Sequence, residues 1–216
     1  MTTPGLVIFD CDGVLVDTER TTNEVLANSV TRYGLPITPD ESIKLFAGGT
    51  IKSAGEEAER RGANLPDDWV EQTYAEIFAA LREGVEVIPG VFPLLDLLDA
   101  RGIAIAVASN GPVAKMEITL RPSGLWDRFD GRIYSGHDHG PKPAPDMILK
   151  ILSDAGVEAR EAVMIDDMAS GCLAARAAGV RCLGYVADGD PSRLDGTGAQ
   201  RIIDLGEVCD LIGLER

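Results

Sequence analysis

The stretch "FDCDGVLVDTE", residues 9–19, decides the fold, because it places two carboxylates directly after the short apolar run "LVIF". Such a run is typical of a strand that is buried on both faces of a parallel sheet. Side chains of an extended chain alternate between two sides, so Asp10 and Asp12 point to one side and Cys11 points to the other, toward the core. Gly13 allows a sharp turn after the strand. The two carboxylates can therefore face one substrate.

The composition is that of a globular protein large enough for one domain with an insertion. The chain has 216 residues, of which 45% are hydrophobic and 25% charged. It contains neither an apolar run long enough for a membrane span nor the pattern of a secretory signal, so we expect a cytoplasmic protein. The cysteines form no C-x-x-C pair, and we expect them to be reduced and to pack as small apolar residues: Cys11, Cys172, Cys182 and Cys209.

The net charge limits the partners that the chain can have. A formal charge of -15 argues against binding to a nucleic-acid backbone or an anionic membrane, since such binding needs a basic patch. We therefore expect no nucleic-acid or membrane partner, and a monomer or weak dimer. A small anionic substrate requires local cations at its site.

The rest of the chain alternates apolar runs with amphipathic segments, which predicts an α/β fold: a parallel sheet with helices on both faces. Besides the first strand at 6–9, strands are expected at 103–109, 132–135, 162–166, 181–186 and 201–204. Helices are expected at 91–101, 112–121, 144–155 and 170–178.

One interval interrupts this alternation. Residues 18–87 contain helical patterns at 18–34, 51–62 and 66–84 and no convincing strand. The sequence therefore predicts a small all-helical cap domain at 18–87, inserted after the first strand, and a catalytic core made of 1–17 and 88–216.

Polar side chains follow several of the predicted strands at the point where each strand ends. The carboxyl ends of parallel strands share one edge of the sheet, which is where ligands bind in open α/β folds. We therefore expect a common site from the residues that follow the first, second and fourth strands and from the loop after the third: Asp10, Asp12, Ser109, Asn110, Lys142, Asp166 and Asp167.

This set of side chains favours phosphate chemistry. Carboxylate oxygens without histidine or cysteine ligands favour a hard cation such as Mg²⁺, which with Lys142 offsets the charge of a phosphate. One aspartate can attack phosphorus and form an aspartyl-phosphate, while a second protonates the leaving alkoxide and then activates water. Ser109 and the N–H groups after it can hold the phosphoryl oxygens, and the expected phosphate-binding residues are Ser109, Asn110 and Lys142.

Four segments together resemble the haloacid dehalogenase superfamily of aspartate-dependent phosphotransferases. "FDCDGVLVDTE" resembles its first motif, "VASN" its second, "KPAPD" its third and "MIDDMASGCLAARAAG" its fourth, in that order. The helical insertion is similar to the cap of the phosphoglycolate phosphatase and β-phosphoglucomutase-like branch. The resemblance implies a Rossmann-like core and an Mg²⁺-dependent phosphatase acting on a small phosphorylated metabolite, such as a sugar phosphate or a phosphoglycolate-like compound.

The resemblance also implies individual roles. It makes Asp10 the nucleophile and Asp12 the general acid and base, and it gives Mg²⁺ to Asp10, to the main-chain carbonyl of Asp12 and to the fourth motif. Counting back from Gly171 puts Asp167 at the ligand position and Asp166 at the acidic position before it. The family often has a serine where this chain has Met168, which leaves the choice between Asp166 and Asp167 open.

The cap segment "FAGGTIKS", residues 46–53, occupies the place where related caps present a substrate loop, so Thr50 and Lys52 are candidates for the distal end of the substrate. Three alternatives to a phosphatase stay open. A β-phosphoglucomutase-like phosphomutase would use the same residues, but the loop has no arginine to retain a second phosphate. A dehalogenase would not need Asp12, and a non-catalytic phosphoaspartate switch would be shorter and would lack the cap.

Overall fold

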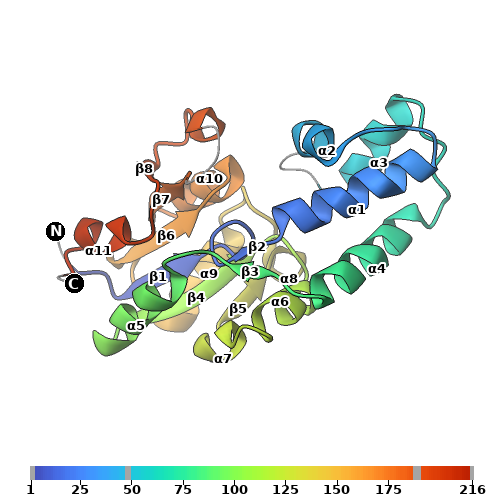
Figure 1. Ribbon diagram of the computed structural model, residues 1–216. Coiled ribbons are helices and arrows are strands. Elements are labelled where there is room, and N and C mark those ends of the chain that lie inside the picture. The colour runs from blue at the N-terminus through green and yellow to red at the C-terminus, as the bar shows by residue number, and fades with distance from the viewer. Residues whose placement is uncertain (1–2, 47–49, 187–190, 215–216) are drawn as a thin grey trace. The chain divides into compact units, whose positions relative to one another are not determined.

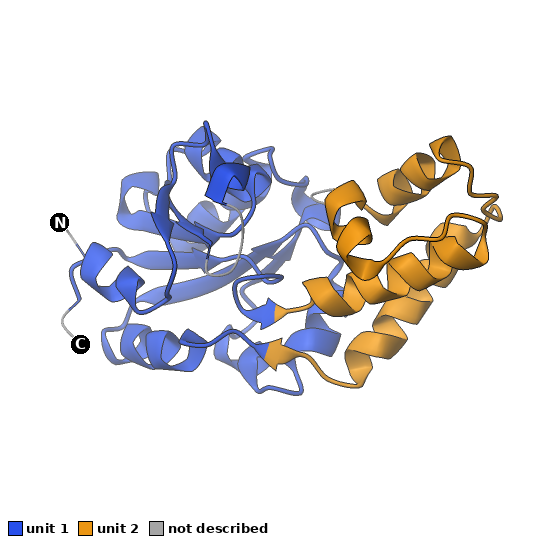
Figure 2. Ribbon diagram, turned by 45° about the horizontal axis from the view of Figure 1, so that its top comes forward, with its two compact units in different colours: residues 1–16, 87–216 blue, residues 17–86 orange. Residues whose placement is uncertain are grey.

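The computed structural model describes residues 3–46, 50–186 and 191–214 (Figure 1). The chain separates into two compact units, an α/β unit of Met1–Val16 with Val87–Arg216 and a helical unit of Asp17–Glu86 (Figure 2). The cap domain was expected at 18–87, so the helical unit begins and ends one residue earlier than expected.

The α/β unit is built on a six-stranded sheet in the order β5-β4-β1-β6-β7-β8, and every neighbouring pair of strands is parallel. The predicted α/β fold class is therefore confirmed. All six predicted strands are present, with bounds that differ from the prediction by at most two residues: β1 Leu6–Phe9, β4 Ala104–Ser109, β5 Ile133–Ser135, β6 Ala162–Asp166, β7 Arg181–Tyr185 and β8 Gln200–Ile202.

The central strand β1 lies between β4 and β6, although these three strands are far apart in the sequence. Phe9 pairs with Val107 of β4 and with Ile165 of β6, and the amide of Asp10 continues the ladder by donating to the carbonyl of Ile165 at 2.9 Å. This register brings the ends of three neighbouring strands together at the point where the strand order reverses, which is where open α/β sheets bind ligands.

Helices cover both faces of the sheet. On one face, Leu6, Ile8 and Met164 pack with the buried sides of α9 (Asp146–Ala155) and α10 (Ala169–Ala177). On the other face, the ring of Phe9 meets that of Phe129 edge-on, with the ring centroids 6.1 Å apart. The other predicted helices of this unit are also present, as α5 Val91–Ala100 and α6 Val113–Leu120.

The helical unit contains α1 Glu19–Arg32, α2 Pro39–Phe46, α3 Ile51–Arg60 and α4 Trp69–Arg82. Trp69 organises its core: the ring is 2% exposed, and its Nε1 donates to Ser29 Oγ on α1 at 2.9 Å. Gly55 of α3 lies against this ring, because a β-carbon there would come within 2.8 Å of it. In the described ranges, no helix is long and apolar enough to cross a membrane.

Short elements were missed by the sequence analysis. Helix α2 was not predicted, and the interval 18–87, expected to lack strands, contains β3 Glu86–Val87, which pairs with β2 Val16–Asp17 just before the interval. These elements are two to eight residues long and, unlike the predicted strands and helices, they contain neither a continuous apolar run nor a clear apolar spacing. The same reason applies to the remaining unpredicted pieces: α7 Leu125–Arg128, α8 Gly136–His139, α11 Glu207–Leu211 and the 3₁₀ turns η1 Ala159–Glu161 and η2 Pro191–Leu194.

Candidate active site

A buried lysine connects the ends of the three central strands. Lys142 Nζ donates to Asp10 Oδ1 at 2.9 Å after β1, to the carbonyl of Ala108 at 3.0 Å in β4, and to Asp166 Oδ2 at 2.7 Å in β6. Lys142, Asp10 and Asp166 are all at most 6% exposed. An ammonium group has three donors, and here protein oxygens accept from all three. Lys142 thus offsets one of the two negative charges and fixes the positions of both carboxylates.

The loop that carries Lys142 is held by Asn110 at the end of β4. The side-chain amide of Asn110 donates to the Lys142 carbonyl at 3.0 Å, and its Oδ1 accepts from the Lys142 amide at 2.7 Å. This reciprocal pair joins two loops 32 residues apart in sequence. The Asn110 side chain is therefore engaged within the protein, although the sequence analysis grouped Asn110 with the phosphate-binding residues.

Ser109 is the last residue of β4 and is 2% exposed. Its Oγ accepts from the amide of Gly111 at 3.0 Å, and the carbonyl of Gly111 accepts from Ser135 Oγ of β5 at 2.8 Å. These bonds fold the chain back immediately after β4. The turn leaves Ser109 beside Gly111, where short side chains and main-chain N–H groups can approach a bound anion.

The adjacent residues Asp166 and Asp167 have different surroundings. Asp166 is fully buried, and its Oδ1 accepts from the Met168 amide at 2.9 Å while its Oδ2 accepts from Lys142. The Asp166 side chain can occupy this position because residue 171 is a glycine, since a β-carbon there would lie only 1.7 Å from Asp166 Oδ2. Asp167 Oδ1 is buried and has no hydrogen-bond partner among the described residues. A buried, unpartnered carboxylate oxygen requires a cation or a proton.

The carboxylates of Asp10, Asp166 and Asp167 fit a divalent metal. Each offers an oxygen, and the three oxygens lie within 4.8 Å of one another. All are hard ligands of the kind that Mg²⁺ prefers. Burial is the main reason that the pKa of Asp10 rises to about 7, and burial also raises the pKa of Asp167, followed by repulsion from Asp10 and Asp166. When no metal is bound, the negative charge of these carboxylates is not fully compensated by nearby cations.

Asp12, the predicted acid and base, lies outside this cluster and has its own lysine. Lys115 Nζ lies 2.9 Å from Asp12 Oδ2, and the two side chains are 16% and 31% exposed. Cys11 between the two aspartates is 1% exposed, and burial raises the pKa of its thiol. The prediction that Cys11 packs into the core is confirmed, and all four cysteines are buried and free.

Two cations near the site were missed by the sequence analysis. Lys115 occupies the first turn of α6, where the helix dipole disfavours a cation, but the exposed Lys52 occupies a similar position in α3, so the position alone gave no signal of a nearby anion. Arg193 in η2 reaches to 3.7 Å from Asp167 Oδ2 and donates to the Tyr185 carbonyl at 3.2 Å. Its short, irregular segment "PSRL" gave no pattern that could have placed it.

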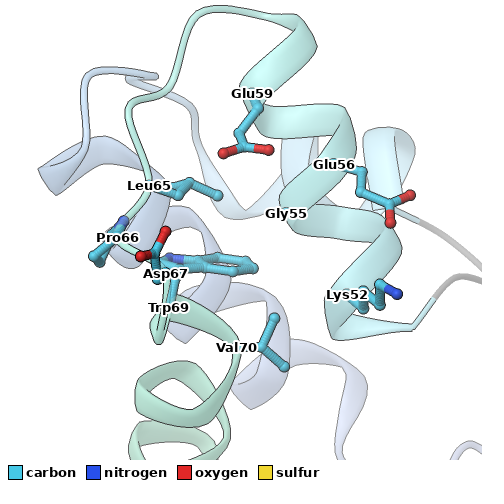
Figure 3. A pocket seen from close by; sticks show the side chains of 9 residues that line it. All are labelled: Lys52, Gly55, Glu56, Glu59, Leu65, Pro66, Asp67, Trp69 and Val70. Carbon is cyan, nitrogen blue, oxygen red and sulfur yellow. The ribbon is translucent and has the colours of Figure 1, made fainter.

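The two cap candidates are on α3 of the helical unit. Thr50 is exposed and caps the helix, with its Oγ1 accepting from the Ser53 amide at 3.1 Å. Lys52 is exposed and lines a pocket of about 250 Å³ between α3 and the start of α4 (Figure 3). Residues 47–49 of the predicted substrate loop lie outside the described residues. The pocket is also lined by Gly55, Glu56, Glu59, Leu65, Pro66, Asp67, Trp69 and Val70.

Comparisons with known proteins agree with this site. The model of the haloacid dehalogenase-like hydrolase family matches residues 7–185. The chain belongs to this family. It is 32% identical to "Probable phosphatase IndB" of Dickeya dadantii, over 83% of the chain and 80% of that protein. It is 27% identical to the 6-phosphogluconate phosphatase of Escherichia coli, over 84% of the chain and 82% of that protein.

A solved haloacid dehalogenase-like protein of unknown function from Agrobacterium tumefaciens has the same fold. It is 31% identical, with a TM-score of 0.86 and coverage of 97% of both chains. The predicted family and the prediction of a hydrolase of the phosphatase kind are therefore confirmed. The roles of the individual residues are proposals.

Proposed function

We propose that this haloacid dehalogenase-like hydrolase is an Mg²⁺-dependent phosphatase that hydrolyses a small phosphomonoester through an aspartyl-phosphate on Asp10. The observation that carries the proposal is the bridge from Lys142 Nζ to Asp10 Oδ1 and Asp166 Oδ2, next to the unpartnered Oδ1 of Asp167. A buried nucleophile held by a lysine beside an incomplete cation site suits attack on a dianionic phosphate.

Asp167 is the better direct ligand of the fourth motif, since its Oδ1 has no protein partner whereas both oxygens of Asp166 accept hydrogen bonds. Asp10 and the main-chain carbonyl of Asp12 complete the proposed protein ligands, with Asp166 positioned behind them. When bound, Mg²⁺ would neutralise the phosphate and the cluster of carboxylates. The sequence did not decide whether Asp166 or Asp167 binds the metal directly, and we therefore propose Asp167.

In the first step, Asp10 attacks phosphorus and the ester P–O bond breaks, while Asp12 gives a proton to the leaving oxygen. In the second step, Asp12 takes a proton from water, the water oxygen bonds to phosphorus, and the Asp10–phosphoryl bond breaks. Ser109 and the main-chain N–H groups after it would hold the phosphoryl oxygens. Lys142 orients Asp10, and it could contact phosphate only by exchanging one of its present partners.

The proposed substrate is a small phosphorylated metabolite of the sugar-phosphate or phosphoglycolate class. The Escherichia coli relative is named a 6-phosphogluconate phosphatase, which agrees with a phosphorylated sugar acid or a compound of similar size. Thr50 and Lys52 stay predictions for the distal end of that substrate. A cytoplasmic location, a monomer or weak dimer, and the lack of nucleic-acid or membrane partners also stay predictions.

Hydrolysis of p-nitrophenyl phosphate, measured with and without Mg²⁺, tests the proposal. We expect turnover that chelation removes and that Asp10→Asn lowers by about a thousandfold or more, because the variant lacks the attacking group. Undiminished turnover after chelation, or in Asp10→Asn, would refute the mechanism. Inorganic phosphate released from a panel of phosphosugars, phosphosugar acids and phosphoglycolate then identifies the substrate class. Transfer of phosphate to a second sugar position, without release, would instead identify a phosphomutase.

A further inference from the structure

Each of the two proposed catalytic aspartates is paired with its own lysine. Lys142 serves Asp10 and is almost fully enclosed, whereas Lys115 Nζ lies 2.9 Å from Asp12 Oδ2 at a site that keeps some contact with solvent. Residues 12 and 115 are far apart in the sequence, and Lys115 belongs to none of the four motifs. The ion pair therefore joins α6 to the turn after β1 at the residue that would transfer the proton.

The position of Lys115 is unfavourable for the helix on its own. It is the third residue of α6, whose first turn contains no acidic side chain, and the helix dipole disfavours a cation there. The side chain of Lys115 is only 16% exposed and its ammonium lies 2.9 Å from the Asp12 carboxylate, so this anion compensates both the partial burial of the cation and its place in the helix.

The loop between β4 and α6 brings Lys115 and Asp12 close to Gly111. Gly111 has no side chain, and a β-carbon there would lie 3.4 Å from Lys115 Cδ, 3.4 Å from Ser109 Oγ and 3.9 Å from Asp12 Oδ2. The side chains of Lys115, Asp12 and Ser109 thus all lie close to Gly111. The carbonyl of Lys115 also accepts from Thr119 Oγ1 at 3.2 Å, which adds a contact within the turn of α6 that presents it.

We propose that Lys115 is a positioning residue that holds the carboxyl group of Asp12 in place for proton transfer to the leaving oxygen. This inference rests on the proposed function. Asp12 gives its proton to the ester oxygen as the P–O bond breaks, and the carboxylate that results is stabilised by Lys115, which keeps all of its own protons. Asp12 then accepts a proton from the attacking water. Without Lys115 the carboxyl group loses the ion pair that ties it to α6.

Leaving groups of different quality test this role. p-Nitrophenolate departs with little need of a proton, whereas the alkoxide of glycerol phosphate needs one. For Lys115→Met we expect kcat to fall at least about tenfold with glycerol phosphate and less than about threefold with p-nitrophenyl phosphate, with KM changed less than about twofold. Lys115→Arg should recover most of the loss. Lys150→Met is the matched control, since Lys150 pairs with Asp154 on the exposed side of α9.

Two further measurements separate positioning from a general disturbance. Mg²⁺ affinity by calorimetry should be unchanged in Lys115→Met, because Lys115 is outside the Asp10, Asp166 and Asp167 cluster. If Lys115→Met does not fold, as judged by circular dichroism, Lys115→Gln replaces it in the same comparison.

Equal losses with both substrates, a loss confined to KM, or no loss would overturn the inference while the proposed function stands. A wild-type protein that hydrolyses neither ester would overturn the proposed function, and the inference with it.

Discussion

Two regions of the molecule present polar residues in opposite surroundings. One is the edge of the parallel sheet at the carboxyl ends of its strands, here called the rim, and the other is the start of α3 in the helical unit. At the rim, Asp10, Lys142 and Asp166 are at most 6% exposed and bonded to one another. On α3, Thr50 and Lys52 are exposed, and the Thr50 hydroxyl caps the helix. Buried charges persist only when paired, so the rim has one fixed arrangement. Exposed polar residues do not need to be paired within the protein, so they can contribute to substrate selectivity.

The largest effect on stability is expected from pH in the chelated protein. The pKa of Asp10 rises from 3.8 to about 7 on folding, so the folded state holds a proton that the unfolded chain has already lost in this range. The stabilisation is complete below about pH 4 and is lost as pH rises through about 7, a change of about 4 kcal/mol at about 1.4 kcal/mol per pKa unit. Urea unfolding at a series of pH values in EDTA measures this slope.

Asp10→Asn is the control for that slope. The variant cannot ionise at position 10, so its stability should fall less steeply than that of the wild type between pH 4 and 7. Asp167 contributes in the same direction in both proteins, because its pKa is also raised. Parallel curves for the two proteins would show that Asp10 is not held as a buried acid.

A matched pair of substitutions compares the two neighbouring acids at the rim. Asp166→Asn removes one of the two carboxylates that neutralise the buried Lys142, which should cost roughly 3 kcal/mol of unfolding free energy. Asp167→Asn should cost less than about 1 kcal/mol, because the Oδ1 of Asp167 makes no hydrogen bond and the lost charge relieves repulsion.

Mg²⁺ affinity should show the reverse order, with the larger loss in Asp167→Asn. Urea unfolding and calorimetric titration with Mg²⁺ measure both quantities on the same two variants. If Asp166→Asn lost more affinity for Mg²⁺ than Asp167→Asn, the assignment of Asp167 as the direct ligand would be wrong.

The smallest effect is expected on the helical unit. Lys52 is exposed, so Lys52→Met should leave both stability and turnover of p-nitrophenyl phosphate within about twofold of wild type, as for ordinary surface changes. KM for the best phosphosugar in the panel should rise about threefold or more if Lys52 contacts the substrate. Lys44→Met on α2 is the control, since Lys44 is also exposed. Equal KM values for the two variants would remove Lys52 from the substrate site.

The sheet and the carboxylates of the site could be predicted because buried strands appear in the sequence as short continuous apolar runs. β1 and β6 are continuous apolar runs, and each ends at the aspartates that the site uses. The topology rule then brings Asp10, Ser109 and Asp166 to one edge without knowledge of any distance.

The contacts between side chains could not be predicted in this way. That Asn110 holds the Lys142 loop, and that Lys115 pairs with Asp12, depends on how segments far apart in the sequence pack in space. Arg193 lies in a 3₁₀ turn with no periodicity, and α2 is only eight residues long. The position of Lys115 in the first turn of α6 was no guide either, because the exposed Lys52 occupies a similar position in α3.

Trapping of the covalent intermediate tests the central claim most directly. Asp12→Asn should still accept phosphate from p-nitrophenyl phosphate, whose leaving group needs little protonation, but should lose it slowly because the base for water is absent. After acid quenching, borohydride reduction converts an aspartyl-phosphate to homoserine, which peptide mass spectrometry locates. We predict homoserine at position 10 only, in the presence of Mg²⁺ and not after chelation. Phosphate release without modification of Asp10, or modification at another aspartate, would contradict the account.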